Sequence, residues 1–133
     1  MAGTDPFNLQ RFVDAQSGGV FEQALAELQD GQKRSHWMWF VFPQHADLGR
    51  SPTAKHFGLS GTEEARAFLD HPILGPRLVA CCDALLPHLR GGKAAAEVLG
   101  DVDALKLGSS MEIFHEADDR EPRFAELLAL ARQ

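Results

Sequence analysis

Apolar residues recur along most of the chain at intervals of three and four, the period of an amphipathic α-helix. The pattern predicts a first helix directly after Asp5-Pro6, where an N-cap residue precedes proline at the first helical position. It predicts a second helix from position 20 to a C-terminal cap at Gly31. Because Gly18-Gly19 interrupts the period, we expect two short helices joined by a glycine turn.

The stretch 36–42 is nearly all apolar and contains both tryptophans of the chain. Seven such residues suit either a buried strand or a buried helical turn, and a short helix ending at Pro43 is favoured. The next stretch, 44–58, contains several glycines, serines and prolines, and it is predicted to be a long surface loop. Loops of that length often carry function.

The sequence pattern in the second half of the chain predicts further helices. Ser60 and Glu63 have the spacing of a capping box, and the helix that they open ends at His71-Pro72. The helical period over 73–89 marks the central core helix. Helices are also expected over 94–99, over 101–117 and from Pro122 onward. Gly108 weakens the middle of the 101–117 helix, so the serines after it are also candidates for capping a restarted helix.

These patterns predict an all-α fold, a compact single-domain orthogonal helical bundle of about six to eight helices spanning residues 1–133. A net charge of -6 argues against nucleic acid as the main partner, because backbone binding requires clustered lysine and arginine. The chain has no apolar run long enough for a membrane span and no signal-peptide pattern near its first residues, so we expect a cytoplasmic protein without a membrane partner. Cys81 and Cys82 are expected to be reduced.

The first candidate site lies in the segment 31–44. The rings of Trp37 and Trp39 suit stacking on a flat ligand, Lys33 suits phosphate or carboxylate, and His36 is the candidate general acid or base. The same residues have an ordinary alternative interpretation. The aromatic side chains then form core, the histidine caps a helix and the lysine lies at a solvated helix end.

The second candidate site is formed by Lys106, Ser109 and Ser110, which are about one helical turn apart. A lysine beside hydroxyl groups can hold a phosphate or supply a base and a nucleophile. No phosphate-loop or serine-nucleophile motif surrounds them, and serines near a glycine commonly act as caps. The six histidines lack metal-ligand spacing, so neither a metal nor a cofactor is predicted.

Several segments together resemble DUF1810, a bacterial and fungal family of unknown function; they are 5–7, 11–16, 31–44, 48–51, 71–78 and 103–111. The resemblance covers nearly the whole chain, and it implies an all-α single domain. Some members of the family are labelled calpastatin, but this short acidic sequence has no feature of a protease inhibitor. The chain departs from the family pattern at Glu112, where a threonine is usual.

The resemblance also implies a set of polar motif residues without an obvious packing role, which are pocket candidates: Arg11, Gln16, Lys33, Ser35, His36, Gln44, Ser51, Lys106, Ser109 and Ser110. The favoured hypothesis is a small enzyme or binding domain for an anionic, phosphate-bearing molecule, such as a nucleotide or an ADP-ribose-like compound. The alternative is a non-catalytic protein-interaction or structural module. The patterns carry no signal for an oligomeric state.

Overall fold

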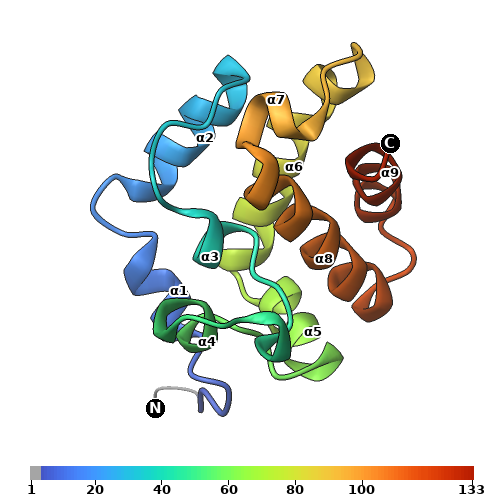
Figure 1. Cartoon of the computed structure of the whole chain (residues 1–133). Helices are drawn as coiled ribbons and strands as arrows, with labels where there is room; N and C mark the ends of the chain where they lie inside the picture. The colour runs from blue at the N-terminus through green and yellow to red at the C-terminus, as the bar shows by residue number, and fades with distance from the viewer. Residues whose placement is uncertain (1–3) are drawn as a thin grey trace.

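The chain is built from helices joined by short connections, as the computed structural model in Figure 1 shows. The structure describes residues 4–133. In chain order the elements are α1 (Gln10–Ala15), α2 (Val20–Asp30), α3 (Met38–Val41), the 3₁₀ helix η1 (Ala46–Leu48), α4 (Pro52–His56), α5 (Thr62–Asp70), α6 (Leu74–Arg90), α7 (Ala95–Leu99), α8 (Asp101–Ala117) and α9 (Pro122–Ala131). Over residues 4–133 the chain contains no strand, so the all-α prediction is confirmed. The nine α-helices of residues 4–133 exceed the expected six to eight because α4 forms in a stretch predicted to be a loop.

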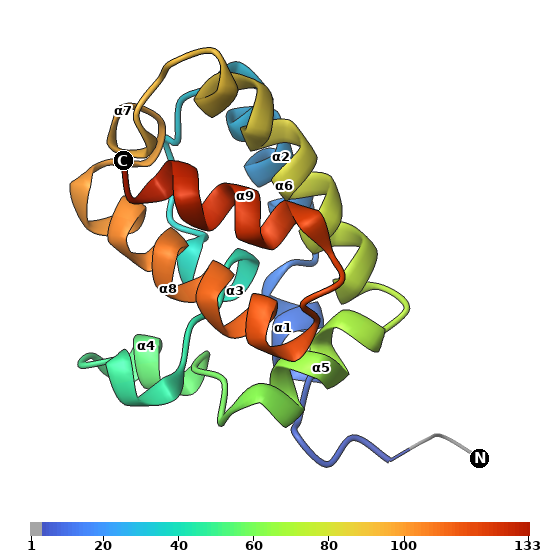
Figure 2. The same ribbon diagram turned by 90° about the vertical axis from the view of Figure 1, so that its right-hand side faces the viewer.

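The two longest helices, α6 and α8, have 17 residues each and organise the packing. Helix α6 packs against α2, α5 and α9, and α8 packs against α5, α7 and α9. The short α3 lies in the middle of the molecule in both Figure 1 and Figure 2. The figures also place α1, α4 and α5 together at one end of the molecule, with α7 at the other.

A chain of aromatic contacts runs through the core from α1 to α9. The ring of Phe12 meets Phe68 edge to face at 5.1 Å, Phe68 lies 5.3 Å from Phe114, and Phe114 lies 5.7 Å from Phe124. All four side chains are fully buried. Since buried aromatic pairs contribute both apolar area and a preferred geometry, this chain fixes α1, α5, α8 and α9 against one another.

The first helix begins later than the sequence predicts. The Asp5 carboxylate accepts hydrogen bonds from the backbone amides of Leu9 and Gln10, at 2.7 and 2.9 Å, so it does cap a helix. Asn8, however, adopts a left-handed conformation with φ of 53°, which interrupts the helical backbone between Asp5 and Gln10. The prediction for the end of α2 is confirmed, since Gly31 has a φ of 75° and closes that helix.

The apolar stretch 36–42 contains the short helix α3, as favoured. The prediction of a loop over 44–58 is wrong in part, because this stretch contains η1 and α4. The Ser51 hydroxyl accepts a hydrogen bond from the Ala54 amide at 3.1 Å, and Pro52 occupies the first helical position. A serine followed by proline is an ordinary helix start, and the spacing of apolar residues in α4 is too short to reveal it.

Two predictions of helix caps are wrong. The amide and hydroxyl of Ser60 both bond to Glu64, at 2.9 Å each, and not to Glu63, because α5 begins one residue later than the capping box requires. Helix α8 continues through Gly108, so Ser109 and Ser110 are interior helical residues and not caps. Packing against three other helices outweighs the intrinsic cost of one glycine, which is about 1 kcal/mol.

The two cysteines of the chain lie next to each other in the core. Cys81 and Cys82 are free and buried in α6. Burial raises the pKa of the Cys81 thiol to about 12 and raises that of Cys82 as well, so both stay protonated at neutral pH. In the part of the chain that the structure describes, no helix combines the length and apolar character that crossing a membrane requires.

Candidate functional site

The aromatic segment 31–44 is anchored to α2 by a buried carboxylate, Glu27, that the sequence analysis did not single out. The indole Nε1 of Trp37 donates to Glu27 at 2.9 Å, and the Ser35 hydroxyl donates to it at 2.6 Å. The amides of Arg34 and Ser35 donate at 2.7 and 3.0 Å, and the Gln23 side chain donates at 2.7 Å. One carboxylate thus organises the chain between α2 and α3.

The hydrogen bonds keep Glu27 ionised although its side chain is fully buried. Burial alone would raise the pKa of this carboxyl, but the hydrogen bonds from Ser35, Arg34, Gln23 and Trp37 lower it far below its ordinary value. The sequence does hold a signal for this residue. Glu27 shares the apolar face of α2 with Ala24 and Leu28, where a charged side chain needs a partner.

The structure brings the two candidate lysines together, but a carboxylate lies between them. Lys33 Nζ is 2.9 Å from Asp103, and Lys106 Nζ is 3.6 Å from the other oxygen of the same carboxylate. Lys33 lies 5.1 Å from the ring centre of Trp37, and Lys106 lies 4.9 Å from that of Trp39. The two ammonium groups are therefore held by partners within the protein, and the site has less positive charge than the sequence suggests.

Other candidate residues are distributed over different parts of the fold. The Gln16 amide donates to the Phe40 carbonyl at 2.8 Å and joins α1 to α3. Ser110 is fully buried, and its hydroxyl has no partner within residues 4–133. His36 is exposed, and with Ser35 and Trp37 it lines a cavity of about 380 Å³ beside the Gly18-Gly19 turn.

The guanidinium of Arg11 is fully used inside the protein. Its Nε and Nη2 donate to the carbonyls of His56 and Gly58, at 2.8 and 2.9 Å, and Nη2 also contacts Glu64 at 2.8 Å. Its Nη1 donates to the carbonyls of residues 7 and 8. All five N–H groups thus have acceptors, and Arg11 fastens the chain that follows α4 onto α1.

We expect Arg11→Met to lower the free energy of unfolding by about 2–3 kcal/mol, because it leaves several backbone carbonyl groups and the buried carboxylate of Glu64 without their donor. The loss is moderated because Glu64 keeps its two hydrogen bonds from Ser60. Urea unfolding measures the change. Arg34→Met is the matched control, since its only ion pair lies on the surface; an equal effect of the two substitutions would contradict this role.

The residues 44–59, which we call the 44–59 loop, leave the helical core and return to the same point. The Ala46 amide donates to the Leu59 carbonyl, and the Leu59 amide donates to the Gln44 carbonyl, both at 2.8 Å. Gly58 is required at this neck, because a Cβ there would lie 2.3 Å from the Ala46 Cα. Compact loops with closed ends are often functional. This one holds the candidate residues Gln44 and Ser51.

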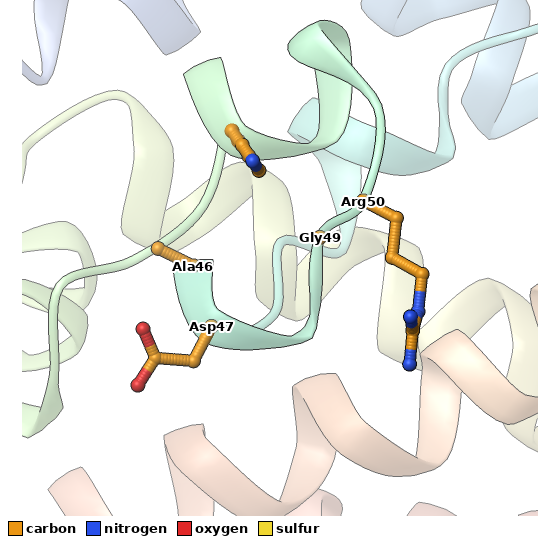
Figure 3. Close-up of a pocket in the computed structure, with 5 residues that line it drawn as sticks. Ala46, Asp47, Gly49 and Arg50 are labelled. Atoms are coloured by element: carbon orange, nitrogen blue, oxygen red, sulfur yellow. The ribbon is translucent and has the colours of Figure 1, made fainter.

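The 44–59 loop forms one wide-open surface cavity of about 710 Å³, which we call the loop pocket. Its lining residues are Ala46, Asp47, Gly49, Arg50 and Lys55. Figure 3 shows Asp47 on the η1 turn and Arg50 on the chain beyond Gly49, with the two side chains extending away from one another. Gly49 fits only because it has no side chain, since a Cβ there would lie 2.9 Å from the backbone of Ala54.

The loop pocket holds cationic side chains that the rest of the protein does not use. Over residues 4–133, all but three lysine and arginine side chains make an ion pair or a side-chain hydrogen bond; the exceptions are Arg50, Lys55 and Arg120. Two of these three line the same cavity, and both are exposed. The loop pocket therefore gathers two of the three cationic side chains that lack a partner within residues 4–133, beside the carboxylate of Asp47.

A second cavity, of about 470 Å³, lies between the 44–59 loop and α8, and we call it the α8 cleft. It is lined by His45, Asp47, Leu48, Ser109, Glu112, Ile113, Glu116 and Arg132. Asp47 lines both cavities, so the α8 cleft adjoins the loop pocket. Ser109 is the one sequence candidate that faces it.

The polar groups of the α8 cleft include both donors and acceptors. Nδ1 of His45 accepts a hydrogen bond from the Asp47 amide at 3.0 Å, so the proton of the neutral ring is on Nε2. Arg132 bonds to Glu112 at 2.6 Å. Among the described residues, no group of three histidine, cysteine, aspartate or glutamate side chains has an arrangement that would hold a metal ion.

A family model described as a protein of unknown function, DUF1810, matches residues 6–131 of the chain. The chain belongs to the DUF1810 family. The crystal structure of the conserved hypothetical protein Rv1873 from Mycobacterium tuberculosis is similar, with 48% sequence identity and a TM-score of 0.88. The similarity covers 94% of this chain and 87% of the mycobacterial one. Among curated proteins, none matches the chain significantly.

Membership of DUF1810 confirms the resemblance that the sequence motifs predict, and it supports the all-α fold. The match includes the 44–59 loop and all of α8, so both cavities belong to the DUF1810 domain; only Arg132 of the α8 cleft lies beyond the matched residues. The family description states no reaction, so the chemistry has to be argued from the cavities.

The sequence analysis did not select Arg50 or Lys55 as candidates. Both lie in the stretch that it predicts to be a long loop, next to the candidate Ser51. Two basic residues flanking a serine-proline helix start in an otherwise acidic chain are the available signal. It is weak, because only the closed shape of the 44–59 loop shows that the two side chains share a cavity.

Proposed function

We propose that this DUF1810 protein binds a small phosphate-bearing anion in the loop pocket. The observation that carries the proposal is the pairing of Arg50 and Lys55, two cations with no partner among residues 4–133, in one cavity of an acidic chain. The proposal keeps the expected ligand class and moves the site from the segment 31–44 to the loop pocket, because Lys33 and Lys106 already form ion pairs with Asp103.

The chemistry of the loop pocket suits phosphate. A guanidinium binds two phosphate oxygens at once, while an ammonium acts as a compact point charge, and the two are commonly used together. The closed neck of the 44–59 loop and the Arg11 hydrogen bonds hold the pocket in place before a ligand arrives. Such preorganisation lowers the entropic cost of binding.

The proposal concerns binding and assigns no reaction. His36, the candidate general acid or base, lines a different cavity, beside the Gly18-Gly19 turn. The imidazole next to the proposed phosphate site is His45, whose neighbour Asp47 lines both cavities. Nucleotides and ADP-ribose-like compounds belong to the ligand class that this arrangement favours.

We expect Arg50→Ala and Lys55→Ala each to weaken binding of inorganic phosphate by about tenfold, because each removes a charge-assisted hydrogen bond. Titration followed by amide chemical shifts in HEPES buffer at low ionic strength measures the dissociation constants. The affinity should fall as sodium chloride is added, since both cations are exposed.

The matched control is Arg120→Ala, which removes an exposed, unpartnered arginine outside both cavities. Its phosphate affinity should equal that of the unaltered protein. If the Arg50 and Lys55 variants bind phosphate as well as the control does, the loop pocket is not an anion site. The interaction or structural module then becomes the favoured function.

A further inference from the structure

The α8 cleft differs in character from the loop pocket that it adjoins. The loop pocket presents Arg50 and Lys55, whereas the α8 cleft presents the carboxylates of Glu112 and Glu116, together with Ser109. A phosphate bound between the two cations would have the rest of its molecule directed over Asp47, which lines both cavities. The side chains of the α8 cleft are therefore the ones next to any organic group that the phosphate carries.

The cleft offers both kinds of hydrogen-bonding group. Glu116 makes no ion pair within residues 4–133, so its oxygens are available as acceptors. Nε2–H of His45 is available as a donor, because Nδ1 is occupied by the Asp47 amide. The Ser109 hydroxyl both donates and accepts.

This mixture distinguishes between two classes of ligand. An ammonium group only donates hydrogen bonds, so it would satisfy Glu116 but leave the His45 donor unused. Hydroxyl groups donate and accept, so neighbouring hydroxyls can bond to a carboxylate and to an N–H group together. Carboxylates bind the hydroxyls of ribose in this way in dinucleotide-binding proteins.

We propose that the α8 cleft binds the hydroxyl groups of a sugar phosphate whose phosphate occupies the loop pocket. This inference rests on the proposed function and adds the chemical class of the ligand. Glu116 and Ser109 bond to the hydroxyls, and His45 donates to a hydroxyl or ring oxygen through Nε2. The Arg132–Glu112 ion pair, at 2.6 Å, lies on the α8 side of the cleft, because Glu112 stands between Ser109 and Glu116 on that helix, and it joins the end of α9 to α8.

The test compares three probes on the same protein: inorganic phosphate, ribose 5-phosphate and O-phosphoethanolamine. Ribose 5-phosphate should bind about tenfold more tightly than phosphate, because it adds hydrogen bonds to a charged acceptor. Ser109→Ala combined with Glu116→Gln should remove most of this advantage, measured as the ratio of the two dissociation constants. Glu22→Gln, on the exposed face of α2, is the control and should leave the ratio unchanged.

The outcomes separate this inference from the proposed function. Equal affinity for ribose 5-phosphate and phosphate would overturn the sugar site while leaving the anion site intact. Tighter binding of O-phosphoethanolamine would overturn it in favour of an ammonium ligand. An unchanged ratio in the double variant would place the sugar elsewhere. Absence of binding by all three probes would overturn both proposals.

Discussion

Replacing Glu27 with alanine is expected to lower the free energy of unfolding by about 4 kcal/mol, because five hydrogen-bond donors lose their shared acceptor. The buried Trp37 indole N–H donates to Glu27, and the substitution removes that acceptor. For a domain whose total stability is about 5–15 kcal/mol, such a loss is a large fraction. Urea unfolding followed by circular dichroism measures it.

Two other substitutions serve as matched controls. Glu22→Ala, on the exposed face of the same helix, should change stability by less than about 0.5 kcal/mol. The loss of stability in Glu27→Gln should lie between those of Glu22→Ala and Glu27→Ala, since the amide keeps one acceptor oxygen but turns an NH₂ group toward donors. If Glu27→Ala is no more destabilising than Glu22→Ala, Glu27 does not organise the segment as described.

The ionisation of Glu27 also makes a prediction about pH. Because folding lowers the pKa of this carboxyl below its ordinary value of 4.5, its stabilising contribution is complete above that value. The contribution falls as the pH decreases, because the unfolded chain binds the proton more readily than the folded one. The difference in stability between the unaltered protein and Glu27→Gln should therefore shrink below pH 4.5, in parallel urea titrations at each pH. A constant difference would show that folding does not lower the pKa of the Glu27 carboxyl.

Trp37→Ala is expected to be the second large effect, lowering the free energy of unfolding by about 3–5 kcal/mol. The Trp37 side chain is 1% exposed, packs against Phe42 and bonds to Glu27, so its removal leaves a cavity and takes one of five donors from Glu27. Trp39→Ala should cost only about 1–2 kcal/mol, because that ring is partly exposed beside Lys106.

The comparison of the two tryptophans separates a core role from a ligand role. Thermal unfolding of both variants, with and without ribose 5-phosphate, gives the stability and the ligand-induced shift in Tm together. Trp37→Ala should lower the Tm most, and Trp39→Ala should retain the shift, since neither ring lines the loop pocket or the α8 cleft. If Trp39→Ala loses the ligand-induced shift in Tm but little stability, the ligand binds at the aromatic segment 31–44 and not in the loop pocket.

The elements that the sequence predicts well are those whose periodicity is long. The spacing of apolar residues is sustained through α6 and α9, and glycine or proline marks their limits. The spacing of apolar residues does not predict an element that is only one turn long, such as α4. It also fails where a local cap competes with packing, as at Ser60. In those places the outcome depends on which distant residue, such as Glu64 beside Arg11, satisfies the local groups.

The candidate site was harder to predict because the role of a charged residue depends on its partners. Arg11, Lys33 and Lys106 look like ligand groups in the sequence, yet each has a carboxylate partner in the fold: Glu64 for Arg11, and Asp103 for both lysines. Arg50 and Lys55 look like ordinary surface residues, and they are the ones that a closed loop leaves free. Ion pairing between residues far apart in the chain cannot be inferred from periodicity.

The sequence by itself determined the all-α class, the positions of the long helices and the membership of DUF1810, because each depends on local periodicity or on motifs. Only the tertiary structure decided which charges are neutralised and which face a cavity. That difference arises because electrostatic partners are brought together by packing across the fold, as Asp103 is with Lys33 and Glu64 is with Arg11.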